Sequence, residues 1–218
     1  MRNLNTVQVP AAPSYWRGRN YAKRYVHGHP DVGALVHETG PLAGLVGRNV
    51  LTILDVENLT ISGRKLGYEL DYAALAKRFN AVADTVHLHA AMSVEPGDKI
   101  DSAHMERAGF TVHTRVIERL RDGSRAANSD NVLAFQTGLL VSRARADVVL
   151  LGSGDGQLIC DLANAIRALP RKRAVWTLSL PGATSKRLDC RHNPAIETNV
   201  EVGLDVLVPL APQRSYEP

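Results

Sequence analysis

From Asn49 onward, short runs of β-branched residues and leucine alternate with segments whose apolar residues recur every three or four positions. The short runs are typical of buried strands, and the longer spacing is typical of helices with one buried face. This alternation predicts parallel strands joined by crossover helices, and therefore an α/β sandwich. The expected strands cover residues 50–54, 85–90, 110–116, 148–151 and 174–180, with a last edge strand at 206–210.

Two helices are expected before the third strand. Apolar residues recur at helical spacing across residues 70–82, and Asp71 lies near the start of that segment, where acidic residues favour a helix. A shorter helix around Met105 is expected to end at Gly109, because glycine readily adopts the backbone conformation that closes a helix.

Two more helices are expected after residue 128. Ser129 can cap the first of them, since its hydroxyl can accept a backbone N–H of the first turn. The second spans residues 158–169, and the segment 181–201 gives no readable pattern. The buried side of the Ser129 helix is expected to carry Val132, Leu133, Phe135, Leu139 and Leu140.

The net charge of +4 lies entirely in the N-terminal part of the sequence. Residues 1–48 hold six basic and two acidic side chains, whereas residues 49–218 hold twenty of each. Aromatic residues are interleaved there with cations that can pair with phosphates while the rings stack on bases. The cations expected to contact RNA are Arg17, Arg19, Lys23 and Arg24. Alternatively, the aromatic residues pack on the main domain or on a second subunit.

Three regions follow from these patterns: a basic N-terminal arm (1–48), an α/β domain (49–210) and a C-terminal tail (211–218). No apolar run approaches the roughly 18 residues that a membrane span needs. Residues 1–10 include Arg2, Asn3, Asn5 and Gln8, where a signal peptide would need an apolar stretch. We therefore expect a soluble cytoplasmic protein without a membrane partner.

Three acidic residues stand where a parallel sheet places its chemistry. Asp55 directly follows the first strand, Asp130 lies in the first turn of a helix, and Asp155 lies in the loop 152–156 after the fourth strand. Ligands bind outside the carboxyl ends of such strands, so Asp55 and Asp155 are expected to converge. Carboxylate oxygens suit Mg²⁺ or Mn²⁺, which can promote hydrolysis. Taken singly, each acid is also explained as a helix cap or a turn residue.

The three segments together resemble the NYN domain family of PIN-like ribonucleases. The segments are LDVENL at 54–59, SD at 129–130 at the start of a helix, and VLLGSGDG at 149–156. The resemblance extends from about residue 50 to residue 180, about three fifths of the chain. It implies a three-layer α/β/α sandwich with a mainly parallel sheet, and cleavage of single-stranded or structured RNA with a divalent metal.

The resemblance also implies roles for individual residues. Asp55, Asp130 and Asp155 would be the catalytic ligands of Mg²⁺ or Mn²⁺. Asn58 would orient the Asp55 loop or a bound water, and Ser153 would hydrogen-bond within the acidic site.

Two glutamines depart from the family pattern. Many members carry a further acid about two turns into the Asp130 helix and another two residues after the Gly-Asp pair, and here these positions are Gln136 and Gln157. An amide can donate an oxygen to a metal or hold a water, but it cannot act as a general base. The departure leaves two outcomes open: a ribonuclease with weaker metal affinity, or a catalytically silent RNA-binding or scaffold module.

Further cations lie close to the acids in the sequence. Arg121, Arg125, Lys186 and Arg187 are expected to contact the RNA backbone, although a solvated surface also explains them. A less favoured alternative is a phosphatase of the haloacid dehalogenase type, which the acidic loop 154–161 faintly resembles. The sequence therefore predicts a metal-dependent endoribonuclease with these two alternatives.

Overall fold

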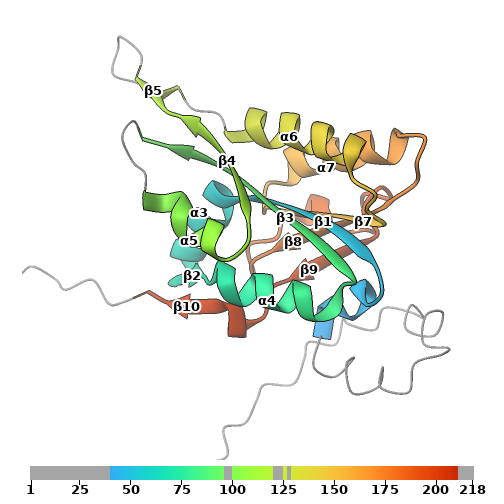
Figure 1. Ribbon diagram of the computed structural model, residues 1–218, viewed down its shortest axis with the longest axis horizontal. Helices are drawn as coiled ribbons and strands as arrows, with labels where there is room; N and C mark the ends of the chain where they lie inside the picture. The colour runs from blue at the N-terminus through green and yellow to red at the C-terminus, as the bar shows by residue number, and fades with distance from the viewer. Residues whose placement is uncertain (1–39, 96–99, 120–124, 127–128, 211–218) are drawn as a thin grey trace, which may run out of the picture. The chain divides into compact units, whose positions relative to one another are not determined.

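Six parallel strands form the central sheet of the computed structural model, which describes residues 40–95, 100–119, 125–126 and 129–210. The strand order is β4-β3-β1-β7-β8-β9 (Figure 1). The strands are β1 (Asn49–Asp55), β3 (Thr85–Val94), β4 (Thr111–Val116), β7 (Val148–Gly152), β8 (Ala174–Ser179) and β9 (Thr198–Glu201). The strand numbers decrease from β4 to β1 and increase from β7 to β9, so the strand order reverses between β1 and β7. The ends of these two strands flank the crevice where parallel sheets bind ligands.

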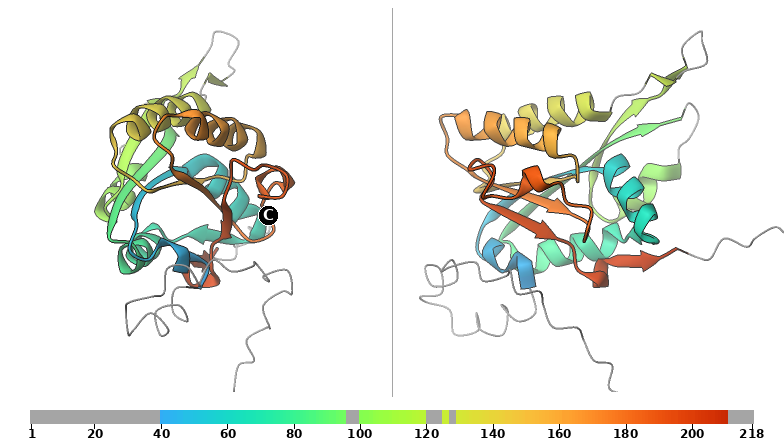
Figure 2. Two further views of the ribbon diagram at one scale, coloured as in Figure 1. Left: turned by 90° about the vertical axis from the view of Figure 1, so that its right-hand side faces the viewer. Right: turned by 180° about the vertical axis from the view of Figure 1, so that it is seen from behind.

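Helices cover both faces of the sheet, as Figures 1 and 2 show. One face packs against α3 (Val56–Leu66), α4 (Tyr72–Val82) and α5 (Ile100–Arg107). The other face packs against α6 (Ser129–Arg143) and α7 (Gly156–Ala168). The predicted three-layer α/β/α sandwich is confirmed, and its sheet of six strands is parallel throughout.

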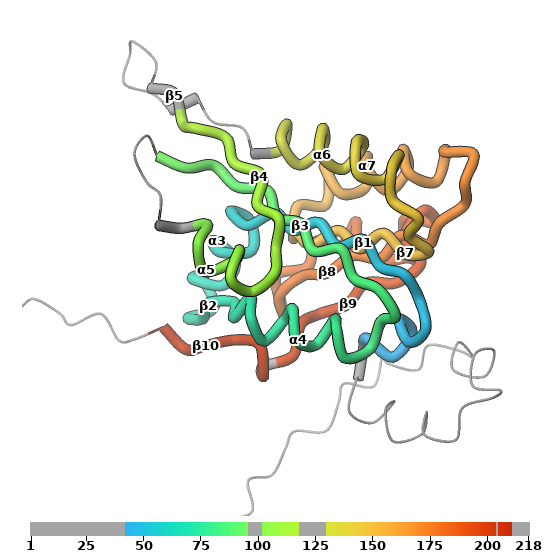
Figure 3. The backbone as a smooth tube through the Cα atoms, viewed as in Figure 1, coloured from blue at the N-terminus to red at the C-terminus, as the bar shows by residue number. Residues whose placement is uncertain are grey.

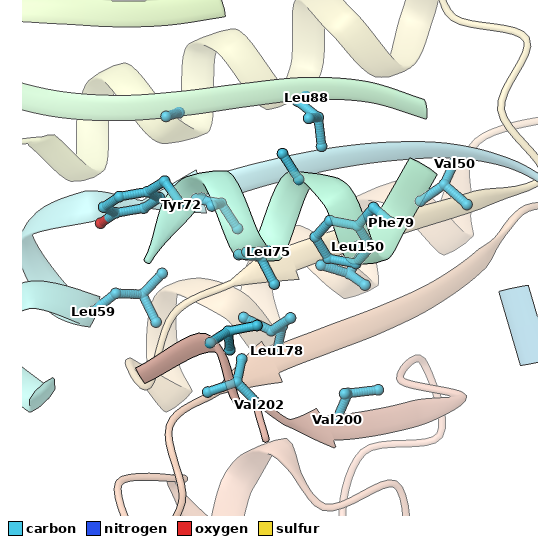
Figure 4. Close-up of a cluster of buried hydrophobic side chains, with 14 of the residues drawn as sticks. Val50, Leu59, Tyr72, Leu75, Phe79, Leu88, Leu150, Leu178, Val200 and Val202 are labelled. Carbon is cyan, nitrogen blue, oxygen red and sulfur yellow. The ribbon is translucent and has the colours of Figure 1, made fainter. Parts of the chain in front are cut away.

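Two apolar clusters hold the layers together. The larger one joins Phe79 and Leu75 of α4 to Leu150, Leu178 and neighbouring sheet residues (Figure 4). The second cluster lies beneath α6 and α7, where Leu133 and Ile159 are buried. Burying each such side chain contributes roughly 1.5–3 kcal/mol, so these clusters fix the helices on the sheet and with them the strand ends.

The short elements η2 (Gly40–Leu45), β2 (Tyr68–Leu70) and β10 (Leu207–Pro209) complete the folded unit. Leu42 and Leu45 of η2 are buried in the larger cluster, so residues that sequence analysis assigned to the arm belong to the core. Residues 1–39 of the predicted arm and the tail 211–218 lie outside the described residues.

The expected last edge strand does not join the main sheet. β10 pairs antiparallel with β2, in a separate two-stranded sheet that includes Leu70, and β9 forms the edge of the main sheet instead. Leu70 therefore precedes the helix to which it was assigned. The helix begins after Asp71, whose carboxylate accepts the N–H of Ala74 at 2.9 Å and caps it.

The predicted buried side of α6 is wrong at Phe135. This side chain is 68% exposed, whereas Leu133, Thr137 and Val141 are buried. Residues four apart share one helix face, so this buried stripe places position 135 on the far side. The helix also includes Ser129 itself as its first residue.

After β4, which Figure 3 shows beside β3, the chain continues into a short antiparallel ribbon. The ribbon pairs β5 (Glu118–Arg119) with β6 (Arg125–Ala126), and α6 begins soon afterwards. Within the described ranges, no helix is long and apolar enough to cross a membrane.

Candidate active site

Asp55 and Asp155 each begin a helix at the carboxyl end of a central strand. Asp55 ends β1, and its Oδ1 accepts the N–H of Asn58 at 3.1 Å, which caps α3. Asp155 follows β7, and its Oδ1 accepts the N–H of Gln157 at 2.8 Å and of Leu158 at 3.2 Å, which caps α7. The capping role considered from sequence is therefore present, and it places both carboxylates at the reversal of strand order.

Ser153 and Asn58 connect the loops that carry these acids. The hydroxyl of Ser153 is fully buried; it donates to Asp55 Oδ2 at 3.0 Å and accepts the N–H of Asp155 at 3.1 Å. The side-chain oxygen of Asn58 accepts the N–H of Gly154 at 2.7 Å. The structure thus brings four predicted site residues into one hydrogen-bonded group, which fixes the Asp55 carboxylate.

The glycines of the loop 152–156 are required by close packing. A Cβ on Gly154 would lie 2.8 Å from the backbone oxygen of Ala183 and 3.1 Å from Asn58 Oδ1. A Cβ on Gly156 would lie 2.1 Å from the hydroxyl oxygen of Ser185. A side chain at either position would push the loop away from its neighbours, and Asp155 with it.

Four carboxylates influence one another at this edge of the sheet. Burial first, and then the charges of Asp130 and Glu57, raise the pKa of Asp55 to about 6, although the hydrogen bonds from Asn58 and Ser153 oppose this. The pKa of Asp130 is raised by burial and then by the charges of Asp155 and Glu57. Like charges raise carboxyl pKa values only at short range, so each of these four carboxylates lies within electrostatic range of at least one other; together they are called the acidic cluster.

Glu57 belongs to this cluster although sequence analysis did not include it. It lies in the first turn of α3, and its Oε1 accepts the backbone N–H of Ser93 at 2.9 Å. This bond joins α3 to the carboxyl end of β3. The sequence offered one signal for Glu57, its position two residues after Asp55. That position places Glu57 over the edge of the sheet only if a helix begins directly after β1, as α3 does.

The donor set fits a hard divalent cation in its chemistry. Across the described residues, no group of three or more His, Cys, Asp or Glu side chains already lies close enough to hold a metal ion. The cluster nevertheless consists of carboxylates, the ligands that Mg²⁺ and Mn²⁺ prefer. Each oxygen of Asp55 accepts one hydrogen bond, and a carboxylate oxygen has capacity for about two contacts. Asp55, Asp130, Asp155 and Glu57 are therefore the candidate ligands, and three or more of them would have to move closer together to hold one ion.

Gln157 is held by partners outside the acidic cluster. Its amide nitrogen donates to both carboxylate oxygens of Asp161, at 3.1 and 3.0 Å, and its amide oxygen accepts from the guanidinium of Arg187. The side chain is exposed on the first turn of α7. Gln136 lies instead beside Phe135 in a groove between α6 and β4. Among the described residues, neither glutamine side chain has a hydrogen bond to Asp55 or Asp155; only the backbone N–H of Gln157 donates to Asp155.

The predicted RNA-contacting cations are described only in part. Lys186 and Arg187 are exposed on η3 (Lys186–Leu188), and Arg187 reaches the start of α7 through Gln157. The backbone of Arg125 pairs with that of Arg119 in the ribbon. The remaining predicted contacts, Arg17, Arg19, Lys23, Arg24 and Arg121, lie outside the described residues.

Comparison with known proteins supports the fold but identifies no family. No protein-family model matches the chain, and no curated protein matches its sequence. A crystal structure of a protein of unknown function from Vibrio parahaemolyticus is similar, with a TM-score of 0.59 and 22% identity over 74% of this chain and 97% of that one. A short-chain dehydrogenase/reductase of Veillonella parvula in complex with NADP gives a TM-score of 0.31 at 15% identity, over 62% and 49%. The first likeness supports the α/β/α fold, and the second is too weak to carry an argument.

Proposed function

We propose that this chain is a cytoplasmic, metal-dependent endoribonuclease that resembles the NYN domain family. The acidic cluster at the reversal of strand order carries the proposal. Asp55 is only 4% exposed, yet Asp130 and Glu57 lie close enough to raise the pKa of its carboxyl group. Gathering acids in a low-dielectric site is unfavourable unless a cation joins them. Phosphodiester hydrolysis is the chemistry that hard divalent cations commonly assist in such sites.

Residues in and around the acidic cluster have defined tasks in this proposal. Asp55, Asp130 and Asp155 would hold Mg²⁺ or Mn²⁺, and the bound ion would lower the pKa of a water and offset charge on the phosphate. Ser153 and Asn58 fix the orientation of the Asp55 loop through their hydrogen bonds. The exposed guanidinium of Arg187 attracts the RNA backbone toward the cluster.

A silent RNA-binding or scaffold module is the second candidate, and the position of Gln157 favours it. Gln157 stands at the position where many members of the NYN domain family carry a further acid. Its side chain forms hydrogen bonds with Asp161 and Arg187. The site then holds fewer negative charges, which weakens attraction for a dication. The phosphatase alternative has no comparable support from the structure.

Cleavage assays on the full chain separate these candidates. Labelled single-stranded RNA and tRNA are incubated with Mg²⁺, Mn²⁺ or EDTA, with Asp55→Asn as the site variant. Asp161→Asn is the matched control, because Asp161 is an exposed acid on α7 outside the cluster. We expect metal-dependent cutting by the parent and by Asp161→Asn only. RNA that is bound but intact would support the module, and phosphate release from a small phosphomonoester would support the phosphatase.

A further inference from the structure

An open groove of about 420 Å³ lies between α6 and the edge strand β4. Arg115 and Val116 line it from β4, and Asn131, Phe135 and Gln136 line it from α6. Its volume lies within the roughly 300–1,000 Å³ range of small-ligand pockets.

Phe135 is exposed in this groove, unlike the other two phenylalanines of the chain. Phe79 and Phe110 are 0% and 3% exposed, whereas Phe135 is 68% exposed. An exposed ring leaves apolar area in water, so no contribution to the core explains it. Its exposed aromatic ring is one of the residues that line the groove.

Two residues that line the groove are neighbours of residues in or bound to the acidic cluster. Asn131 follows Asp130 directly on the first turn of α6. Arg115 is the register partner of Ser93, whose backbone N–H donates to Glu57. These two neighbours place the groove beside the acidic cluster.

We propose that this groove binds single-stranded RNA, with one unpaired base stacked on Phe135 and the adjacent phosphate paired with Arg115. The proposal deepens the ribonuclease function and rests on it, since it assumes that RNA is the ligand of the acidic cluster. Aromatic rings stack on any base, and cations track the phosphate backbone of single strands. The amides of Asn131 and Gln136 can each donate to and accept from a base edge. A duplex keeps its bases stacked inside, so the substrate must present an unpaired nucleotide.

Binding is measured without metal, so that the result does not depend on catalysis. Full-length protein is titrated in EDTA against fluorescein-labelled hexauridylate, and anisotropy is followed at several salt concentrations. Phe135→Ala is expected to weaken binding about 5- to 150-fold, the range that loss of one stacked base gives. Phe135→Trp keeps a ring and is expected to retain affinity. The matched control is Ile61→Ala, which removes a 54% exposed apolar side chain from α3 on the other face.

Arg115 is tested by the salt dependence of the same binding. For single strands, each phosphate contact contributes about 0.7 to the slope of log affinity against log salt. Arg115→Gln is therefore expected to reduce that slope by about 0.7, while Phe135→Ala leaves it unchanged. The control is Arg64→Gln, an exposed arginine in the last turn of α3.

The proposal fails if the parent does not bind the oligonucleotide, if Phe135→Ala binds it as the parent does, or if Phe135→Ala weakens a duplex equally. These results are separable from those for the ribonuclease function. Stacking on Phe135 without cleavage in Mg²⁺ or Mn²⁺ supports the groove and removes the nuclease. Cleavage that is indifferent to Phe135 keeps the nuclease and removes the groove.

Discussion

Ser153 donates a 3.0 Å hydrogen bond to Asp55 although 98 positions separate them in the sequence. The bond joins the ends of β1 and β7, the two strands between which the strand order turns back. It stabilises the ionised form of Asp55 and thus opposes the effect of burial on the pKa. Burial still dominates, and a buried carboxylate therefore destabilises the metal-free protein at neutral pH.

Asp55→Asn is expected to stabilise the protein in EDTA at pH 8. Burial raises the pKa of Asp55 to about 6, so between roughly pH 4 and 6 the folded state holds a proton that the unfolded chain has lost. Stability from this group falls as pH rises through that window, and the full cost above it is about 3 kcal/mol. Asparagine carries no charge and is an equally good helix cap. Urea denaturation at pH 8 and pH 4 measures the difference.

The gain from Asp55→Asn should be present at pH 8 and shrink toward pH 4. Asp161→Asn serves as the control, because that exposed carboxylate lies outside the buried cluster. Equal stabilities of parent and Asp55→Asn at pH 8 would show that Asp55 is not destabilised by burial. The same variant is the one that the ribonuclease proposal requires to lose cleavage, so a stable but inactive protein is expected.

Gly154→Ala tests whether packing of the acidic loop controls the site. The added Cβ would lie 2.8 Å from the backbone oxygen of Ala183, which cannot rotate away. We expect a loss of about 1–3 kcal/mol of unfolding free energy. We also expect reduced cleavage, because the displaced loop would carry Asp155 with it. Gly138→Ala is the control: it lies within α6, and nothing stands within 4 Å of its added Cβ. Alanine there should stabilise the helix by about 0.5–1 kcal/mol.

If Gly154→Ala lowers stability but leaves cleavage unchanged, packing of this loop does not control the catalytic site. A gain in stability, as expected for Gly138→Ala, would contradict the close contact with Ala183. Thermal melting and initial cleavage rates on one RNA are sufficient to distinguish these results.

Apolar runs predicted five of the six strands of the main sheet, and they were clearest in β1, β7 and β8, which are buried on both faces. β7 is an unbroken run of buried residues, and such runs are readable without knowledge of their partners. The convergence of Asp55 and Asp155 also followed from sequence, since parallel strands end at the same edge.

Features that depend on a particular three-dimensional neighbour were not predicted. Gly63 interrupts α3 in the sequence, but a Cβ there would lie 2.8 Å from the backbone oxygen of Tyr68, so the glycine serves packing. Ile61 is exposed on the same helix, which blurs the apolar periodicity. Without α3, the place of Glu57 in the cluster could not be inferred. The partners of Gln157 were equally hidden, because Arg187 lies 30 residues away.

Gln157→Asp is expected to leave the metal dependence of cleavage unchanged. The Gln157 side chain forms hydrogen bonds with Asp161 and Arg187. Among the described residues, it forms none with the carboxylates of the acidic cluster. An aspartate at this exposed site would pair with Arg187 and repel Asp161, effects that largely cancel on a solvated surface. Cleavage rates across a series of Mg²⁺ concentrations provide the measurement.

A lower Mg²⁺ requirement in Gln157→Asp would show that position 157 points into the cluster when metal is bound. Arg187→Gln provides the companion variant, since it removes the cation that holds Gln157 without adding an acid. If both variants raise activity at limiting metal, release of the residue 157 side chain is the cause. If neither does, Asp55, Asp130 and Asp155 hold the ion without it.

His89 and His113 make the stability of the sheet sensitive to acid. Their rings are stacked with centroids 5.3 Å apart, and His89 Nδ1 lies 3.1 Å from His113 Nε2. One nitrogen must donate and the other accept, so the contact requires one ring to be neutral. Burial, together with repulsion by His113 and His87, lowers the pKa of His89 to about 4. Burial also lowers the pKa of His113.

Because the pKa values of both histidines are lowered in the folded protein, the protein loses stability as the pH falls. An unfolded histidine titrates near pH 6.5, so between about pH 6.5 and 4 the unfolded chain binds protons that the folded protein refuses. Stability from His89 is therefore complete above pH 6.5 and is lost as the pH falls toward 4. His89→Asn cannot titrate there, and it should lose less stability between pH 7 and pH 5 than the parent. His192→Asn, at an exposed position, should follow the parent. Equal losses for His89→Asn and the parent would show that this stacked pair does not set the acid limit of the fold.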